Sequence, residues 1–162
     1  MADVIDQQGY RANVGIVLIN NQKEIFFAKR KRQSGWQFPQ GGIRTGESLK
    51  SAMYRELLEE TGLTKDHVEV IYQSKTWYQY KIPKTHLRTP TNDSHQVIGQ
   101  KQKWFLVKLN GSDVSVNLTF DSKTNQEFDD WKWVDVSIPA KEVIWFKQDV
   151  YQKVLTEFQI FL

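Results

Sequence analysis

The sequence contains no cysteine among its 162 residues. Disulfide bridges and thiolate metal sites are therefore excluded, and the composition suits a reducing compartment. The first ten residues lack both the basic region and the apolar region of a secretory signal. The longest apolar run, residues 14–19, is far shorter than the ~20 residues that a membrane-spanning helix needs. These absences predict a cytoplasmic protein with no membrane segment.

The composition that remains is typical of a folded domain. Hydrophobic residues make up 40% of the chain and aromatic residues 13%, which is enough for a sizeable core. A chain of 162 residues is too short for two comfortable domains, so we expect one domain over residues 1–162. The formal net charge of +3 is compatible with a polyanionic substrate without requiring one.

Periodicity divides the chain into strands and two main helices. Residues 14–19 form a β-branched run that predicts a buried strand, and residues 24–28 return from it after a turn. In residues 99–108, Lys101 and Lys103 alternate with Gln100, Gln102 and Trp104, so the two sets should lie on opposite faces. Further strand patterns lie at 68–72, 76–83 and 128–136, and helix patterns at 47–62 and 147–161. This order predicts an α/β fold, a mixed sheet with helices on both faces.

Three glutamates gather on the helix that begins near Ser48 and ends near Gly62. Glu56, Glu59 and Glu60 stand at i, i+3 and i+4, and therefore project from one side. The same stripe is apolar one and two turns earlier, which places the acids in a partly enclosed cleft where unpaired charges are costly. A solvated acidic face is the ordinary alternative. The setting favours a compensating hard cation, Mg²⁺ or Mn²⁺, because both prefer carboxylate oxygens.

This helix and the glycine loop before it carry a family resemblance. Gly41, Glu47 and the run ArgGluLeuLeuGluGluThrGlyLeu at 55–63 resemble the complete box of the Nudix hydrolases, with every fixed position filled. That family cleaves nucleoside diphosphates linked to another moiety. The resemblance implies a Nudix-type α/β/α sandwich with a central mixed sheet. It also implies a divalent-metal-dependent pyrophosphohydrolase, with Mg²⁺ as the expected cofactor and Mn²⁺ as a second option.

The resemblance assigns roles to individual residues of the box. The implied metal ligands are Glu56, Glu59, Glu60 and a backbone carbonyl at Gly41 or Gln40. Glu47 and Arg55 would pair and orient the site. The general base of many Nudix enzymes lies in a loop between late strands, where Glu127 stands here as base and further metal ligand. Asp129 and Asp130 are the alternatives to Glu127 if the loop register differs.

A wider resemblance covers most of the chain. It is to the branch of the family that removes pyrophosphate from triphosphorylated 5′ ends of RNA, leaves a monophosphate and so admits decay nucleases. It is carried by residues 6–15, 35–43, 52–57, 80–83, 98–106, 127–134 and 146–151. Residues 84–97 and 111–125 carry none of it, and the isolated histidines His86 and His95 receive no role.

This wider resemblance implies a set of substrate-binding residues. Arg30 and Lys103 would hold phosphates, and Tyr80 would face the triphosphate, with Gln40 and Gln100 as further polar contacts. Arg11 and Phe146 would sandwich the first or second base, with Ile144 beside it. Stacking of bases on aromatic rings and arginine planes is the usual way to hold single-stranded RNA. On residue type alone, Phe146 is more simply a core aromatic residue.

Two other functions remain open from the sequence. Dinucleoside polyphosphate hydrolases share almost the same motifs, and one enzyme could act on both kinds of substrate. A non-catalytic nucleotide- or RNA-binding module is the alternative of a different class. The intact glutamate set argues against such a module, because binding alone would need cations more than clustered acids. No segment of the sequence indicates a protein partner.

Overall fold

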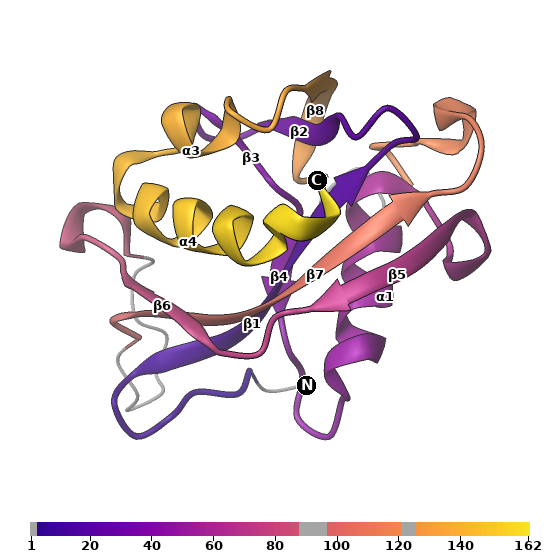
Figure 1. The fold of residues 1–162 in the computed structure, drawn as a ribbon. Helices are drawn as coiled ribbons and strands as arrows, with labels where there is room; N and C mark the ends of the chain where they lie inside the picture. Colours follow the sequence, from indigo (N-terminus) through magenta and orange to yellow (C-terminus); the bar gives the residue numbers. More distant parts are fainter. Residues whose placement is uncertain (1–2, 88–96, 121–125) are drawn as a thin grey trace.

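An eight-stranded mixed sheet forms the centre of the protein (Figure 1). The structure, a computed structural model, describes residues 3–87, 97–120 and 126–162. The main path of the sheet is β3 (Trp36–Gln37), β2 (Ile25–Arg30), β1 (Tyr10–Ile19), β7 (Gly99–Leu109) and β5 (Val68–Gln73). Off this path, β4 (Gln40–Gly42) pairs with β1, β6 (Tyr78–Lys81) with β7, and β8 (Phe128–Val134) with β2.

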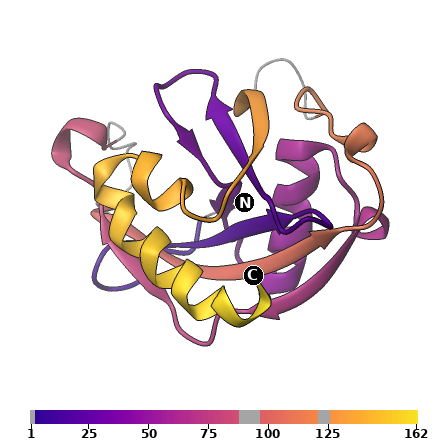
Figure 2. The same cartoon turned by 45° about the horizontal axis from the view of Figure 1, so that its top comes forward.

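The parallel pair β1–β7 lies at the middle of the sheet, with Tyr10 opposite Gly99 and Ile19 opposite Lys108. The other strand pairs are antiparallel. Helices α1 (Leu49–Thr61) and α4 (Gln148–Phe158) lie on opposite sides of this pair, as Figure 2 shows with α1 in magenta and α4 in yellow. The predicted mixed sheet with helices on both faces is therefore confirmed.

Alternation along the two central strands builds the two halves of the core. In β1, Val14 and Ile16 pack in the cluster that contains the buried side of α1. Val17 and Ile19 pack in the cluster that contains the buried side of α4. In β7, Phe105 belongs to the α1 side and Trp104 to the α4 side. Because successive side chains of a strand point to opposite faces, each strand supplies both clusters.

Helix α1 begins and ends where the sequence predicts. The Ser48 hydroxyl accepts a hydrogen bond from the Ser51 amide at 3.1 Å, which caps the first turn. Gly62 adopts the left-handed conformation with φ +76°, and its amide donates to the Leu58 carbonyl. These two caps fix which residues of the acidic helix face the sheet.

Short elements differ most from the sequence prediction. Strand β6 covers Tyr78–Lys81 rather than residues 76–83, and strands β3 and β4 were not predicted. The latter contain two and three residues, too few to show a period. Helix α3 (Pro139–Glu142) precedes α4, and 3₁₀ turns lie at 65–67, 84–86, 113–115, 145–147 and 159–161. Within the described part of the chain, no helix is both long and apolar enough to cross a membrane.

Candidate active site

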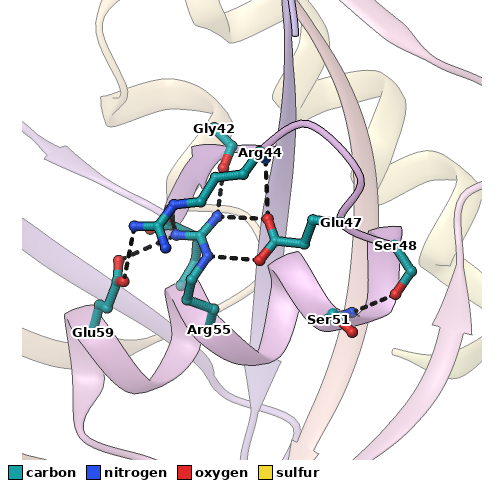
Figure 3. Close-up of polar contacts among 8 residues, drawn as sticks. Gly42, Arg44, Glu47, Ser48, Ser51, Arg55 and Glu59 are labelled. Carbon is teal, nitrogen blue, oxygen red and sulfur yellow. Dashed lines mark hydrogen bonds and ion pairs between the residues drawn. The ribbon is translucent and has the colours of Figure 1, made fainter. Parts of the chain in front are cut away.

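Arg55 is the centre of the polar contacts on α1 (Figure 3). Its Nε and Nη2 donate to the two carboxylate oxygens of Glu47 at 2.8 and 2.9 Å, and Nη2 also donates to the Gly42 carbonyl at 2.7 Å. Its Nη1 donates to Glu56 at 2.7 Å and to Glu59 at 3.3 Å. The guanidinium thus ties the glycine loop to the acidic side of the helix.

The ion pair between Glu47 and Arg55 supports the acidic side of α1. The hydrogen bonds from Arg55 hold the pKa of Glu47 below its usual range, and those from Glu47 are the main cause that raises the pKa of Arg55. The Arg44 amide donates to Glu47 at 3.1 Å, and the Arg44 guanidinium lies 3.7 Å from Glu59. The structure therefore brings together the two residues predicted to orient the site.

Burial sets the acids of α1 apart from ordinary surface glutamates. Glu56 and Glu60 are each only 8% exposed, whereas Glu59 is partly exposed. Burial raises the pKa of Glu56 to about 7, although Arg55 opposes this shift. Burial also raises the pKa of Glu60 well above its ordinary value, and the charges of Glu56 and Glu127 add to the effect. A cation would relieve both the desolvation and the mutual repulsion.

Gly41 in β4 lies directly against one of these carboxylates. A Cβ atom at this position would come within 1.8 Å of the Glu56 carboxyl carbon and 2.1 Å of both its oxygens. The neighbouring amide of Gln40 donates to Glu60 at 3.2 Å. Only glycine leaves room for the Glu56 carboxylate beside the backbone. The first strand residues after Pro39 thus form one wall of the acidic site.

The donor set fits a hard divalent cation in its chemistry, since it combines buried carboxylates with nearby backbone carbonyls. In the described residues, no three acidic or histidine side chains already converge on one point. Arg55 explains this, because its Nη1 holds Glu56 and Glu59. A divalent cation would therefore compete with Arg55 for the Glu56 carboxylate.

Glu127 lies across the site, just before β8. Its carboxylate is 3.5 Å from Nε of Arg30, at the end of β2. The other two candidates for the general base are more exposed than Glu127. Asp129 pairs with Lys29 at 3.3 Å on the exposed surface, and Asp130 is also exposed. The charge of Glu127 acts on the pKa of Glu60, so Glu127 lies near the acids of α1.

Lys147 lies near these residues, and the sequence prediction did not name it. It is only 5% exposed, and its Nζ donates to Oε1 of Gln37 at 2.8 Å. Burial, and then the charge of Arg30, lower the pKa of Lys147 to about 7, while Glu127 and Glu60 act in the opposite direction. A lone lysine in the run IleTrpPheLys was the available signal, but burial of its ammonium depends on the tertiary fold.

A chain of side-chain amides leads away from the acids on the α4 side of the sheet. Gln102 donates to Asn13 at 2.9 Å and to Gln40 at 3.3 Å. Gln40 donates in turn to Gln100 at 3.4 Å, and the Tyr80 hydroxyl donates to the same oxygen at 2.7 Å. Burial raises the pKa of the Tyr80 hydroxyl. Asn13 and Gln102, both buried, were also missed by the sequence prediction.

The remaining predicted substrate-binding residues divide between two faces. Arg11 lies opposite Gln100 in the sheet register and is 3.1 Å from Asp3. Ile144 and Phe146 pack against the α4 cluster, with the Phe146 ring 6.0 Å from that of Tyr80. Lys103 is not brought to this group. Its Nζ donates to the Lys75 carbonyl at 2.8 Å from the opposite face of β7. His86 lies against Phe146, and His95 falls outside the described residues.

Comparison with known proteins identifies the family. The family model of the NUDIX domain matches residues 9–154. The chain belongs to the Nudix family. It is 52% identical over 160 residues to a protein named RNA pyrophosphohydrolase from Pseudoalteromonas translucida, covering 98% of this chain and 90% of that protein. It is 48% identical over 158 residues to one of the same name from Shewanella oneidensis, covering 97% and 88%.

Solved Nudix-type structures show the same fold at low identity. The E. coli dihydroneopterin triphosphate pyrophosphohydrolase superposes with a TM-score of 0.68 at 18% identity, covering 90% of this chain and 95% of that one. A C. elegans Ap4A hydrolase complex gives 0.63 at 19% identity, covering 93% and 99%. At such identities the likeness concerns the fold alone. The predicted Nudix hydrolase with its α/β/α architecture is confirmed.

Replacing Gly41 by Ala should disable the site without unfolding the protein. The new methyl group would displace the Glu56 carboxylate, which can move because it is the end of a flexible side chain. A misplacement of this size predicts an about 100-fold lower kcat/KM on a pyrophosphate substrate. Gly42→Ala is the matched control, since its Cβ would meet nothing closer than 3.4 Å. Equal activity of both variants would contradict this assignment.

The raised pKa of Glu56 predicts a pH-dependent stability of the metal-free protein. Its pKa is 4.5 for an ordinary glutamate and about 7 in the fold, so the folded state binds more protons between these values. The free energy of unfolding should therefore fall as pH rises from 4.5 to about 7. Lys147, with its pKa lowered from 10.5 to about 7, acts only above this window and with the opposite sign.

Urea unfolding in the presence of a chelator measures this dependence. Glu56→Gln should flatten the decline, although Glu60 will retain part of it because its pKa is also raised. Glu69→Gln, at an exposed position of β5, should keep the wild-type slope. A wild-type slope in Glu56→Gln would show that Glu56 is not the buried titrating group.

Proposed function

We propose that this protein hydrolyses the 5′-triphosphate end of RNA, releasing pyrophosphate and leaving a 5′-monophosphate. The observation that carries the proposal is the 52% identity, over nearly the whole chain, to a relative named RNA pyrophosphohydrolase. The site supports it, because an acidic cluster suited to a divalent cation adjoins a surface of amide, aromatic and cationic groups. Removal of pyrophosphate would expose the RNA to decay nucleases.

The acids of α1 would hold a divalent cation, Mg²⁺ or Mn²⁺. Glu56, Glu59 and Glu60 are the proposed ligands, joined by Glu127 and by the Gly41 carbonyl. When bound, such a cation neutralises charge on the phosphoryl oxygens and makes water a better nucleophile. Arg55 and Glu47 would keep these carboxylates in place, since Arg55 contacts both Glu56 and Glu59. This arrangement leaves little covalent chemistry to the protein, as is usual in phosphoryl transfer.

Glu127 would accept a proton from the attacking water at its carboxylate. Arg30, 3.5 Å from Glu127, and the buried Lys147 would contact the phosphates. A phosphate bound near Lys147 would favour the charged form of its amine, because the negative charge of the phosphate would offset the cost of burying the ammonium. Tyr80 and Gln100 lie on the same face as Gln40 and would orient the triphosphate. Lys103 would act elsewhere, because it leaves the opposite face of the sheet.

Phe146 and Arg11 would hold a base of the RNA, with Ile144 at its edge. Arg11 and Phe146 both lie beside the chain of amide side chains. Arg11 is opposite Gln100 in the sheet register, and the Phe146 ring contacts that of Tyr80. Aromatic rings and guanidinium planes stack on unpaired bases with little regard to sequence. The same face thus offers contacts for both phosphate and base.

The test compares two substrates with the purified protein in Mg²⁺. One is a 5′-triphosphorylated RNA and the other a diadenosine polyphosphate. We expect the higher kcat/KM with RNA, with pyrophosphate and 5′-monophosphorylated RNA as the products. A higher kcat/KM with the diadenosine compound would replace the proposal by dinucleoside polyphosphate hydrolysis. Turnover of neither would favour a non-catalytic binding module.

Glu56→Gln and Glu59→Gln should each lower kcat by at least about 100-fold, since several kcal/mol of charge stabilisation in the transition state are at stake. Both variants should remain folded, because glutamine keeps the size of the side chain. Glu69→Gln on exposed β5 is the control and should keep full activity. Activity that survives either substitution in α1 would refute the proposed ligand set.

A further inference from the structure

A cavity of about 410 Å³ opens beside the proposed base-binding residues. Its walls come from two loops and from the segment before α4. The lining residues are Gln33, Ser34, Thr85, His86, Leu87 and Ile144. This volume lies within the ~300–1,000 Å³ of sites that hold small ligands. The cavity is therefore large enough for a nucleotide-sized group.

The lining combines the groups that a nucleotide requires. Leu87 and Ile144 supply apolar surface, while Gln33, Ser34 and Thr85 supply side-chain donors and acceptors. The loops that carry them also contain Lys31, Arg32 and Lys84, which would attract a phosphate backbone. Apolar contact and hydrogen bonding for a base thus lie next to positive charge for its phosphate.

An exposed tryptophan stands next to this cavity. Trp145 follows the lining residue Ile144 and is 67% exposed, an unusual position for so large an apolar side chain. Its ring meets that of Phe146 edge to face, with centroids 5.5 Å apart. The His86 ring meets Phe146 at 5.2 Å. Phe146 thus links the amide chain to an outer aromatic surface formed by His86 and Trp145.

We propose that the cavity and the Trp145 ring form a subsite for a nucleotide of single-stranded RNA downstream of the base held by Phe146. The inference rests on the proposed function and extends it, because it concerns the body of the RNA rather than its triphosphate. Every base has a flat face that can stack on an exposed tryptophan, so the subsite selects for chain length rather than sequence. It would distinguish RNA from a free nucleoside triphosphate.

The test is a comparison of substrates of increasing length. Wild-type protein and Trp145→Ala are assayed with a nucleoside triphosphate and with 5′-triphosphorylated RNAs of two and four nucleotides. Loss of one stacked base should lower kcat/KM by about tenfold on the tetranucleotide. It should leave the nucleoside triphosphate unchanged, and Trp145→Phe should restore most of the loss. An equal loss on all substrates, or no loss on any, would overturn the proposal.

Trp77 provides a matched control. It is also exposed, at 39%, but its ring lies near Lys101 and Lys103, away from the residues that line the cavity. Trp77→Ala should therefore show no dependence on RNA length. If Trp77→Ala reproduces the effect of Trp145→Ala, general aromatic exposure rather than this subsite is responsible, and the proposal fails.

Binding of the product separates this inference from the proposed function. A 5′-monophosphorylated tetranucleotide with a fluorophore at its 3′ end is titrated with protein and followed by anisotropy. Trp145→Ala should raise Kd by about tenfold. If wild-type protein binds this RNA through Trp145 but hydrolyses no triphosphorylated RNA, the subsite stands and the proposed function falls. An unchanged Kd in Trp145→Ala would overturn the subsite itself.

Discussion

The guanidinium of Arg55 is the interaction on which the acidic site depends. One planar group contacts the two oxygens of Glu47, the Gly42 carbonyl and the carboxylates of Glu56 and Glu59. A lysine could not replace it, because a single ammonium cannot span this fork of acceptors. Without Arg55, the buried Glu56 would lose its hydrogen-bonded partner and would still face the charge of Glu59. The loop and the helix therefore share one electrostatic support.

Strand pairing in the sheet connects the contacts of Arg55 to the rest of the site. Strand β4 pairs with β1, so that Gly41 lies against Glu56 while the Gln40 amide reaches Glu60. The Gln40 side chain turns to the α4 side, where it joins Gln102 and Gln100 on β7. The segment 40–42 thus connects the acids of α1, the proposed metal ligands, to the proposed substrate face beneath α4. A shift of this short strand would disturb both.

Local signals in the sequence account for the parts of the fold that were predicted. Ser48 and Gly62 determine the ends of α1 through contacts within a few residues, and the β-branched run at 14–19 lies within strand β1. The box motif also placed Glu47 near Arg55 correctly. No local sequence pattern predicts which polar side chains the tertiary fold will bury. Tertiary packing buries the amine of Lys147 and makes Asn13 and Gln102 part of a polar chain.

Lys103 shows a conflict between two kinds of sequence argument. Alternation placed it on the face opposite Gln100 and Gln102, whereas family resemblance grouped it with the phosphate ligands. The structure follows the alternation, because β7 pairs with β1 in an unbroken parallel register from residue 99 to 108. In a strand without a bulge, side chains alternate between the two faces of the sheet. Lys103 therefore cannot lie on the same face as Gln100 and Gln102. The side-chain period therefore correctly predicted the face on which Lys103 lies.

The proposed hydrolysis depends on the acids of α1 as a binding site for a divalent cation. Binding of Mn²⁺ to the substrate-free protein, followed by electron paramagnetic resonance, tests this most directly. The measurement is best made near pH 8, above the pKa of about 7 of Glu56, so that its carboxylate is charged. Wild-type protein should bind Mn²⁺, and Glu56→Gln should bind it more than about tenfold more weakly. Wild-type affinity in Glu56→Gln would contradict the account.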